Sequence, residues 1–193
     1  MDNAWLNGGG NVTTIGVLAI QGAFSLHRTH IEALGAKYAE VSEAAQFAEI
    51  DGLILPGGES GAMLKLLAGT SLEAALIAYL ADKPVWGICA GGILMARAVT
   101  GPAQRSFGIL DVVVERNAYG RQCDSMNATV DGYRVAYIRA PRIIATGEGV
   151  TVRARRDGNP CWVESGPRMA TTFHPEVNTA VPSPWHQRLA AFC

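Results

Sequence analysis

Uninterrupted apolar runs alternate with helical patterns in the first half of the chain. The segment TIGVLAI, Thr14 to Ile20, is rich in β-branched residues and has no polar alternation, which is typical of a strand covered on both faces. The runs DGLILP and KPVWGI repeat this pattern. Apolar residues recur at helical spacing in three intervening segments, residues 25–34, 62–67 and 72–80. Strands that alternate with helices predict an α/β fold with a mainly parallel sheet.

The pattern changes after Gly101, where shorter strands with partial alternation take over. The pairs Asp131-Gly132 and Asp157-Gly158 are turn signals between such strands. The predicted strand segments are DVVVERN, ATVDGYRVAYIRAP, VTVRARRDG and CWVESG. We therefore expect a strand-rich, partly antiparallel second half, closed by a short helix over residues 185–192.

Length and composition indicate a single globular domain. The chain has 193 residues, of which 49% are hydrophobic and 17% charged, with a net charge of −1. Residues 1–13 contain three consecutive glycines and are predicted to be a flexible leader, followed by one domain over 14–193. The leader has neither the pattern of a signal peptide nor that of a membrane anchor, and no strongly basic segment is present. We expect a cytoplasmic protein that binds neither membranes nor nucleic acid.

The cysteines and histidines do not predict a metal site. The four cysteines lack CxxC spacing and the density of a disulfide scaffold, so reduced thiols are expected. His27 and His30 lie three residues apart on a predicted helix, but no third ligand is apparent. We therefore expect this pair to lie on a solvated helix face, and we assign no role to His186.

The sequence VWGICAGG places Cys89 between a predicted strand and a predicted helix. Taken alone, this cysteine is better explained as a buried core residue in a glycine-rich turn, because free cysteine is among the most buried residue types. The order of strand, Gly87-x-Cys89-x-Gly91 and helix, however, is that of the nucleophile elbow of hydrolases, with Cys in place of Ser. Glycines are needed at an elbow because its backbone is strained and the strand and helix pass close together. A helix amino terminus also favours the thiolate.

A nucleophilic cysteine needs a base, and the segment TTFHPE provides a candidate. His174 lies at the end of an apolar segment, and Glu176 follows two residues later on the same side of the chain. The glutamate can then hold the imidazole in the tautomer that accepts the thiol proton. The sequence therefore predicts a triad of Cys89, His174 and Glu176.

The segment LILPGGESG ends a predicted strand with two glycines. It lacks the spacing and the lysine of a phosphate-binding loop. A backbone N–H of Gly57 or Gly58 is able to face a developing oxyanion, because glycine allows peptide orientations that other residues exclude. A plain tight turn explains these glycines equally well.

Several segments together resemble a known family. They are IGVLAIQGAF, LILPGGES, GICAGG, VVVERNAYGRQCDS, YIRAP and FHPE. They resemble the family of glutaminase subunits of pyridoxal 5'-phosphate synthase, which are triad-type (class I) glutamine amidotransferases. The resemblance extends from about Thr14 to Glu176 and implies a flavodoxin-like three-layer sandwich, in which helices flank a mainly parallel central sheet.

The resemblance also implies an activity and a set of site residues. It implies that Cys89 attacks the side-chain amide of L-glutamine, that His174 transfers protons and that Glu176 orients it, releasing glutamate and ammonia without a cofactor. The ammonia would pass to a synthase subunit of barrel fold in a hetero-oligomer. The implied glutamine contacts are Gly58, Glu59, Ser60, Arg116, Ile138 and Arg139, and the expected oxyanion hole is formed by Gly57, Gly58 and Ala90.

Two alternatives remain open at this point. The chain could be the glutaminase subunit of another amidotransferase pathway, although the stretch ERNAYGRQCDS argues against it. It could also be a non-glutaminase cysteine hydrolase or chaperone of similar fold, although those proteins have His directly after the nucleophile and this chain has Ala90. The chain departs from the family pattern at Gly61, where Ser or Thr is usual, and at Gly92, where a bulky aliphatic residue is usual.

Overall fold

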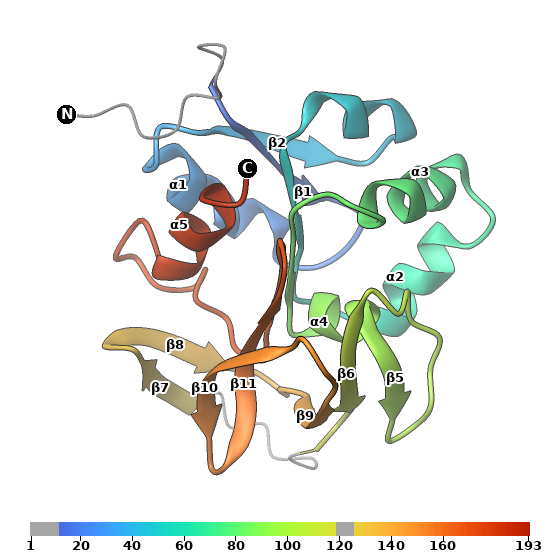
Figure 1. Cartoon of the computed structure of the whole chain (residues 1–193). Coiled ribbons are helices and arrows are strands. Elements are labelled where there is room, and N and C mark those ends of the chain that lie inside the picture. The colour runs from blue at the N-terminus through green and yellow to red at the C-terminus, as the bar shows by residue number, and fades with distance from the viewer. Residues whose placement is uncertain (1–11, 119–125) are drawn as a thin grey trace.

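A seven-stranded sheet runs through the centre of the protein (Figure 1). The computed structural model describes residues 12–118 and 126–193. The strand order is β10-β11-β12-β4-β3-β1-β2, with parallel pairing from β12 to β2 and antiparallel pairing among β10, β11 and β12. These strands are β1 (Thr14–Leu18), β2 (Lys37–Val41), β3 (Gly52–Leu55), β4 (Val85–Ile88), β10 (Thr151–Arg156), β11 (Asn159–Ser165) and β12 (Arg168–Thr171). The predicted α/β fold with a mainly parallel sheet is confirmed.

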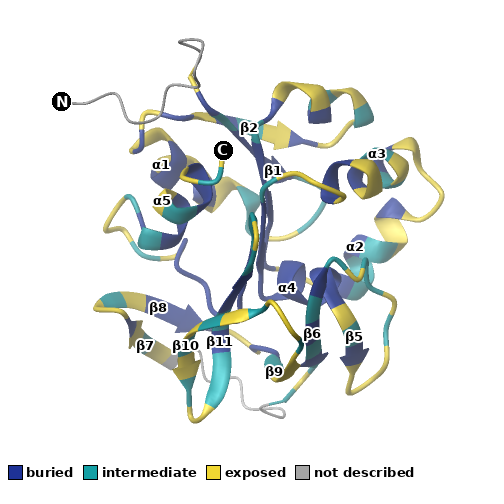
Figure 2. Ribbon diagram, in the orientation of Figure 1, coloured by how far each residue is buried: buried dark blue, intermediate teal, exposed yellow. Residues whose placement is uncertain are grey.

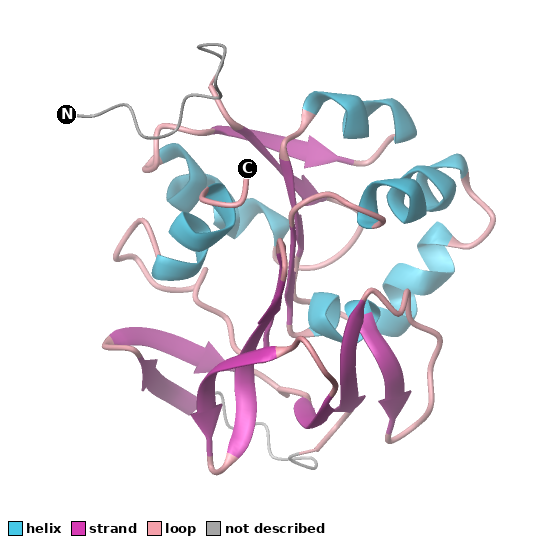
Figure 3. Ribbon diagram, in the orientation of Figure 1, coloured by secondary structure: helices cyan, strands magenta, loops and turns pink. Residues whose placement is uncertain are grey.

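Helices cover both faces of this sheet (Figure 3). One face carries α1 (His27–Glu32) and α5 (Pro184–Ala190), and the other carries α2 (Ser60–Leu67), α3 (Ser71–Leu80) and α4 (Ala90–Met95). Two 3-10 segments, Phe24–Leu26 and Ala44–Glu49, complete the helical elements of the described chain. The helices predicted over 62–67 and 72–80 correspond to α2 and α3, and the closing helix begins and ends slightly earlier than expected.

The second half adds strands outside the central sheet. One small sheet has the order β5-β6-β9, and β7 and β8 form a hairpin. These strands are β5 (Ala96–Thr100), β6 (Leu110–Glu115), β7 (Met126–Val130), β8 (Tyr133–Tyr137) and β9 (Arg142–Thr146). The hairpin turns at Asp131-Gly132, where both residues have positive φ, 47° and 79°, as a two-residue turn requires.

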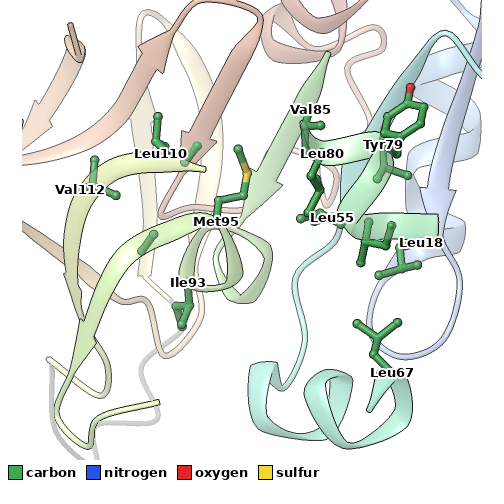
Figure 4. Close-up of a cluster of buried hydrophobic side chains, with 14 of the residues drawn as sticks. Leu18, Leu55, Leu67, Tyr79, Leu80, Val85, Ile93, Met95, Leu110 and Val112 are labelled. Atoms are coloured by element: carbon green, nitrogen blue, oxygen red, sulfur yellow. The ribbon is translucent and has the colours of Figure 1, made fainter. Parts of the chain in front are cut away.

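The core is divided by the sheet into apolar clusters on its two faces. On the α2–α3–α4 side, Leu18 and Leu55 of the sheet pack with Leu67 and Leu80 of the helices, and the cluster continues to Val112 of β6 (Figure 4). Figure 2 shows that α4 is buried along its whole length. The short helix that follows Cys89 is therefore held rigidly by its surroundings.

The prediction for His27 and His30 is wrong, because both side chains are buried with no exposed surface. The predicted helix over 25–34 consists of a 3-10 turn followed by α1, and α5 packs against its histidine face (Figure 1). The covering element comes from the far end of the chain, about 160 residues later. The face of α1 that carries His27 and His30 would be solvated if α1 were isolated, but α5 covers it and excludes water.

Of the predicted leader, residues 1–13, the structure describes only residues 12 and 13. Residues 1–11 lie outside the described residues, and the carbonyl of Thr13 already accepts a hydrogen bond from the N–H of Lys37. In the described chain, no single helix is long and apolar enough to span a membrane; α2 and α3 meet that test only jointly, and they bend by 115° between them.

Candidate active site

The predicted site residues gather at the carboxyl ends of neighbouring parallel strands. Gln21 follows β1, Gly57 follows β3, Cys89 follows β4 and His174 follows β12. In α/β sheets, the crevice outside the carboxyl ends of the strands is the usual place for a ligand. Residues distant in sequence are thus brought together by the strand order alone.

Cys89 occupies the sharp turn between β4 and α4. Its backbone has φ 49° and ψ −99°, a combination that non-glycine residues rarely adopt and that surrounding structure must enforce. A Cβ at Gly87 would lie 2.6 Å from the carbonyl carbon of Gly91, and a Cβ at Gly91 would collide with the backbone of Leu55. The Cys89 N–H donates to the carbonyl of Thr171 over 2.8 Å. The geometry is that of the elbow predicted from the sequence.

His174 and Glu176 form a buried pair beside this turn. The Nδ1 atom of His174 lies 2.7 Å from Oε1 of Glu176. β12 ends at Thr171, earlier than the sequence suggested, and His174 is instead held by backbone hydrogen bonds of 2.7 and 3.2 Å to Ala136 of β8. Strand β8 therefore fixes the backbone of His174 near the carboxyl end of the parallel sheet.

The electrostatic environment favours protonation of His174. Burial alone would lower the pKa of His174, but the neighbouring Cys89 thiol and Glu176 carboxylate outweigh it and raise that pKa to about 10. Burial would raise the pKa of Glu176, yet its hydrogen bond and charge interaction with His174 hold it below its ordinary value. The imidazole is thus a strong acceptor for the thiol proton, and the carboxylate stays ionised beneath it.

A cleft of about 320 Å³ opens over Cys89 and His174. All the residues expected to contact glutamine line it: Gly58, Glu59, Ser60, Arg116, Ile138 and Arg139. A guanidinium nitrogen of Arg139 lies 3.7 Å from Oε1 of Glu59, and both side chains are more than half exposed. The Ser60 hydroxyl is buried and donates to Oε1 of Gln104 over 3.1 Å. The cleft therefore carries accessible groups of both charges.

The glycine pair at the end of β3 packs directly against the imidazole. A Cβ at Gly57 would collide with the ring of His174, so no larger residue fits there. The Gly57 carbonyl accepts a hydrogen bond of 3.0 Å from the N–H of Ala23. Ala90, the third residue expected in the oxyanion hole, is the first residue of α4, where the N–H has no acceptor within the helix.

Several cleft residues were not predicted from the sequence. Gln21 accepts a hydrogen bond of 2.8 Å from the N–H of Glu59 and lies under Gly58. Asn117 lines the cleft with a positive φ of 53°, and the apolar side chains of Leu26 and Val177 border it. The sequence signals were weak: Gln21 ends the first apolar run, and Asn117 follows Arg116. Cys123 and the rest of residues 119–125 lie outside the described residues.

Comparison with known proteins identifies relatives over most of the chain. The SNO glutamine amidotransferase family matches residues 17–182. The pyridoxal 5'-phosphate synthase subunit PdxT of Koribacter versatilis is 47% identical over 169 residues, covering 84% of this chain and 88% of its own. The PdxT of Deinococcus radiodurans is 42% identical over 176 residues, covering 85% and 90%.

Solved structures also match over most of the chain. A glutamine amidotransferase crystal structure aligns with a TM-score of 0.81 at 35% identity, covering 92% of this chain and 98% of its own. PurLQS from Thermotoga maritima aligns with a TM-score of 0.64 at 17% identity, covering 93% of this chain and 98% of that one, which shows a shared fold and no more.

Proposed function

Because the chain belongs to the SNO glutamine amidotransferase family, we propose that its cleft hydrolyses L-glutamine to L-glutamate and ammonia for pyridoxal 5'-phosphate synthesis. The observation that carries the proposal is the arrangement of Cys89 on a strained elbow beside a buried pair of His174 and Glu176. The relatives described above are named as subunits of pyridoxal 5'-phosphate synthase, which favours this pathway over other amidotransferase pathways.

The geometry supports a thioester mechanism. His174 takes the proton of the Cys89 thiol, and the thiolate sulfur attacks the amide carbon of glutamine. The resulting oxyanion is stabilised by backbone N–H groups among Gly57, Gly58 and Ala90. His174 then donates its proton to the leaving nitrogen, so that the C–N bond breaks and ammonia departs. A water molecule, deprotonated by His174, hydrolyses the thioester to glutamate and restores the thiol.

Glu176 orients the imidazole through these steps. Its hydrogen bond to Nδ1 leaves Nε2 as the atom that exchanges protons with sulfur and nitrogen, and its charge stabilises the imidazolium that forms.

Charged groups of the cleft complement an amino-acid substrate. Glutamine carries a carboxylate and an ammonium group, and the cleft presents the guanidinium groups of Arg116 and Arg139 and the carboxylate of Glu59. Glu59 and Arg139 already form an exposed ion pair with each other, which a zwitterion is able to replace with two charge-matched contacts.

A second protein is expected to take up the ammonia. We infer a hetero-oligomer with a separate synthase subunit of barrel fold, in the cytoplasm, because the relatives are named as subunits and the sequence motifs resemble that family. Leu26, Ile138 and Val177 border the cleft with about 40% of their surface exposed, at 45%, 39% and 43%. Exposed apolar residues grouped around a cleft are typical of a docking surface.

The proposal is tested by incubating the chain and its synthase with glutamine labelled with ¹⁵N in the side-chain amide. We expect release of glutamate and transfer of ¹⁵N to pyridoxal 5'-phosphate, and Cys89→Ala should abolish both. Glutamate release that continues in Cys89→Ala, or no release by the complete complex, would contradict the proposal.

A further inference from the structure

One polar side chain outside the cleft is hydrogen-bonded to a residue that lines it. Gln104 belongs to the connection between β5 and β6, and its Oε1 atom accepts a hydrogen bond of 3.1 Å from the hydroxyl of Ser60, the first residue of α2. Figure 1 shows this connection beside α2. Ser60 lines the cleft, and Gln104 lies outside it. The contact therefore links the cleft to a residue 44 positions away in the sequence.

The connection that carries Gln104 is anchored on both sides of this residue. Before it, the carbonyl of Thr100, at the end of β5, accepts a hydrogen bond of 2.9 Å from the N–H of Arg116. After it, the guanidinium group of Arg105 pairs with the carboxylate of Glu73 on α3, whose side chain is only 12% exposed. The backbone around Gln104 is therefore attached to the body of the domain, and its amide faces Ser60 from a fixed position.

The oxygen of the Gln104 amide is the atom used in this contact. The Nε2 atom of Gln104 is buried and has no hydrogen-bond partner among the described residues. In the described chain, a Cβ at Gly61 would have Oε1 of Gln104, 3.9 Å away, as its one neighbour beyond its own stretch of helix. No side chain at position 61 therefore competes with the Ser60 hydroxyl for the amide oxygen.

The direction of this hydrogen bond determines what Ser60 offers to a ligand. A hydroxyl has one proton to donate and two lone pairs that accept. Because the proton of Ser60 is donated to Gln104, only lone pairs remain for a ligand in the cleft. The preceding residue, Glu59, also lines the cleft and adds a carboxylate. Two adjacent acceptors, one of them negatively charged, match an ammonium group.

We propose that Gln104 is a positioning residue for substrate recognition: by accepting the Ser60 proton, it fixes the Ser60 oxygen as an acceptor for the α-ammonium group of glutamine. This inference rests on the function proposed above. Gln104 touches neither the substrate nor the reacting atoms, and it acts only through Ser60. The ammonium end of glutamine then lies at Glu59 and Ser60, and its carboxylate end lies at the guanidinium groups of Arg116 and Arg139.

The first test measures the contact between Ser60 and Gln104 without substrate. Thermal unfolding of wild type, Ser60→Ala, Gln104→Met and the double variant forms a double-mutant cycle. Each single variant leaves one partner without its hydrogen bond, so the two losses in melting temperature should sum to more than the loss in the double variant. Additive losses would overturn the proposal. This measurement needs no activity, so it stays decisive even if the complete complex were to release no glutamate.

The second test compares the kinetics of three variants in the complex with synthase. Gln104→Met releases the Ser60 hydroxyl and is expected to raise KM for glutamine about tenfold with little change in kcat, because a hydrogen bond to a charged group is weakened. Gln104→Glu keeps an oxygen acceptor and should recover most of the loss. Gly61→Ala, the matched control, brings a methyl group no closer than 3.9 Å to Gln104 and should keep the wild-type KM. A Gln104→Glu variant as impaired as Gln104→Met would overturn the proposal.

A pair of inhibitors separates recognition of the ammonium group from general damage to the cleft. Glutarate is glutamate without the α-amino group, so it has no donor for the Ser60 oxygen. In wild type, glutamate should inhibit glutamine hydrolysis more strongly than glutarate does. In Gln104→Met, the inhibition constant of glutamate should rise about tenfold while that of glutarate stays unchanged. An equal change in both constants would mean that the substitution disturbs the cleft as a whole, and it would overturn the proposal.

Discussion

At the scale of single residues, Cys89 differs chemically from the other described cysteines. It lies on the strained elbow in the cleft, whereas Cys161 is a buried residue of β11 and burial raises its pKa. Cys193 is exposed as a residue, but partial burial of its sulfur raises its pKa to about 12. We therefore expect a glutamine-analogue electrophile to alkylate Cys89. Peptide mapping by mass spectrometry should find the label there, and predominant labelling of Cys123 or Cys161 would contradict the assignment.

Substitution of His174 should reduce glutaminase activity more than substitution of Glu176. His174→Ala removes the proton carrier and is expected to abolish glutaminase activity. Glu176→Gln offers an amide to Nδ1 and is expected to lower kcat about 10⁴-fold with little effect on KM, because it disturbs the tautomer rather than substrate binding. Steady-state kinetics in the complex test this, and melting temperatures near the wild-type value show that the fold is retained. A Glu176→Gln variant with wild-type kcat would remove Glu176 from the triad.

Residue spacing in the sequence predicted the candidate active site, but it did not predict that His27 and His30 are buried. The Gly-x-Cys-x-Gly spacing and the His-Pro-Glu sequence predicted which residues meet, and the structure brings them together. The same helical spacing placed His27 and His30 on one face with Ile31 and Leu34, which are core residues. That signal was present in the sequence, but histidine is polar enough for a solvated face to seem the simpler interpretation. Only the packing of α5 decides which face is covered.

At the scale of elements, α4 contains glycines with opposite requirements. A Cβ at Gly91 would collide with the backbone of β3, whereas a Cβ at Gly92 would have its nearest neighbour 3.5 Å away, an ordinary contact. Since glycine inside a helix costs about 1 kcal/mol relative to alanine, Gly92→Ala is expected to raise the melting temperature by about 2 °C.

Gly91→Ala is the matched control, one residue away in the same helix. It should lower the melting temperature by several degrees or prevent folding, because backbone atoms rather than a flexible side chain must move. Thermal unfolding of both variants followed by circular dichroism is the measurement. Equal destabilisation by the two substitutions would show that the space beside Gly92 is not available.

The packing of α1 against α5 should make the protein sensitive to mild acid. His27 has a pKa lowered from 6.5 to about 4, so between these values the unfolded chain binds a proton that the folded chain does not, and stability falls as pH falls. The expected loss from His27 alone is about 3 kcal/mol. Glu164 and Glu176, whose pKa values lie below 4.5 in the folded protein, lose their stabilising effect only at lower pH.

Urea unfolding at several values between pH 6.5 and 4.5 measures this effect. His27→Leu should be less stable than wild type at pH 6.5 but should lose less stability on acidification. Parallel pH dependence of the two proteins would contradict the prediction.

Strand prediction succeeded for the continuous apolar runs and for the partly alternating segments that form β6, β7, β8, β10 and β11, and it missed β2, β5 and β9. β1, β3 and β4 are covered on both faces, and their sequences have the continuous apolar pattern of such strands. β2 was missed because Lys37 and Glu40 interrupt an edge strand, and β5 was missed because it directly follows α4 without a turn signal. Edge strands owe their position to pairing partners, which a single sequence window does not contain.

At the scale of the whole molecule, the strand order creates the cleft and the surface around it. The strand β12, from the end of the chain, pairs with β4 and so brings His174 beside Cys89. No local pattern specifies this neighbour, since β12 lies about 80 residues after β4 in the sequence. The triad was predicted from the chemistry that a nucleophilic cysteine requires, a base held by a third group, and not from periodicity.

The whole-molecule arrangement also predicts control by the synthase. The Gly57 carbonyl is held by the N–H of Ala23, and the 3-10 turn that begins after Ala23 ends at Leu26, which is exposed beside the cleft. Rotation of the Gly57–Gly58 peptide toward the oxyanion must break this hydrogen bond. A partner that contacts Leu26 differently in the two states is able to shift the equilibrium between them.

We therefore expect the chain alone to hydrolyse glutamine slowly and the complex to do so about 10²–10³-fold faster, since a missing oxyanion donor costs about that factor. Ammonia released without an acceptor would be lost, which gives such coupling a purpose. The measurement is kcat for glutamate release from one preparation, without and with saturating synthase. Leu26→Asp should bind synthase more weakly or be activated less, while Leu66→Asp, exposed on α2 and absent from the cleft, should behave like wild type. Equal kcat values in the two conditions would mean that the oxyanion hole is already formed in the isolated chain and that the glycine pair is only a turn.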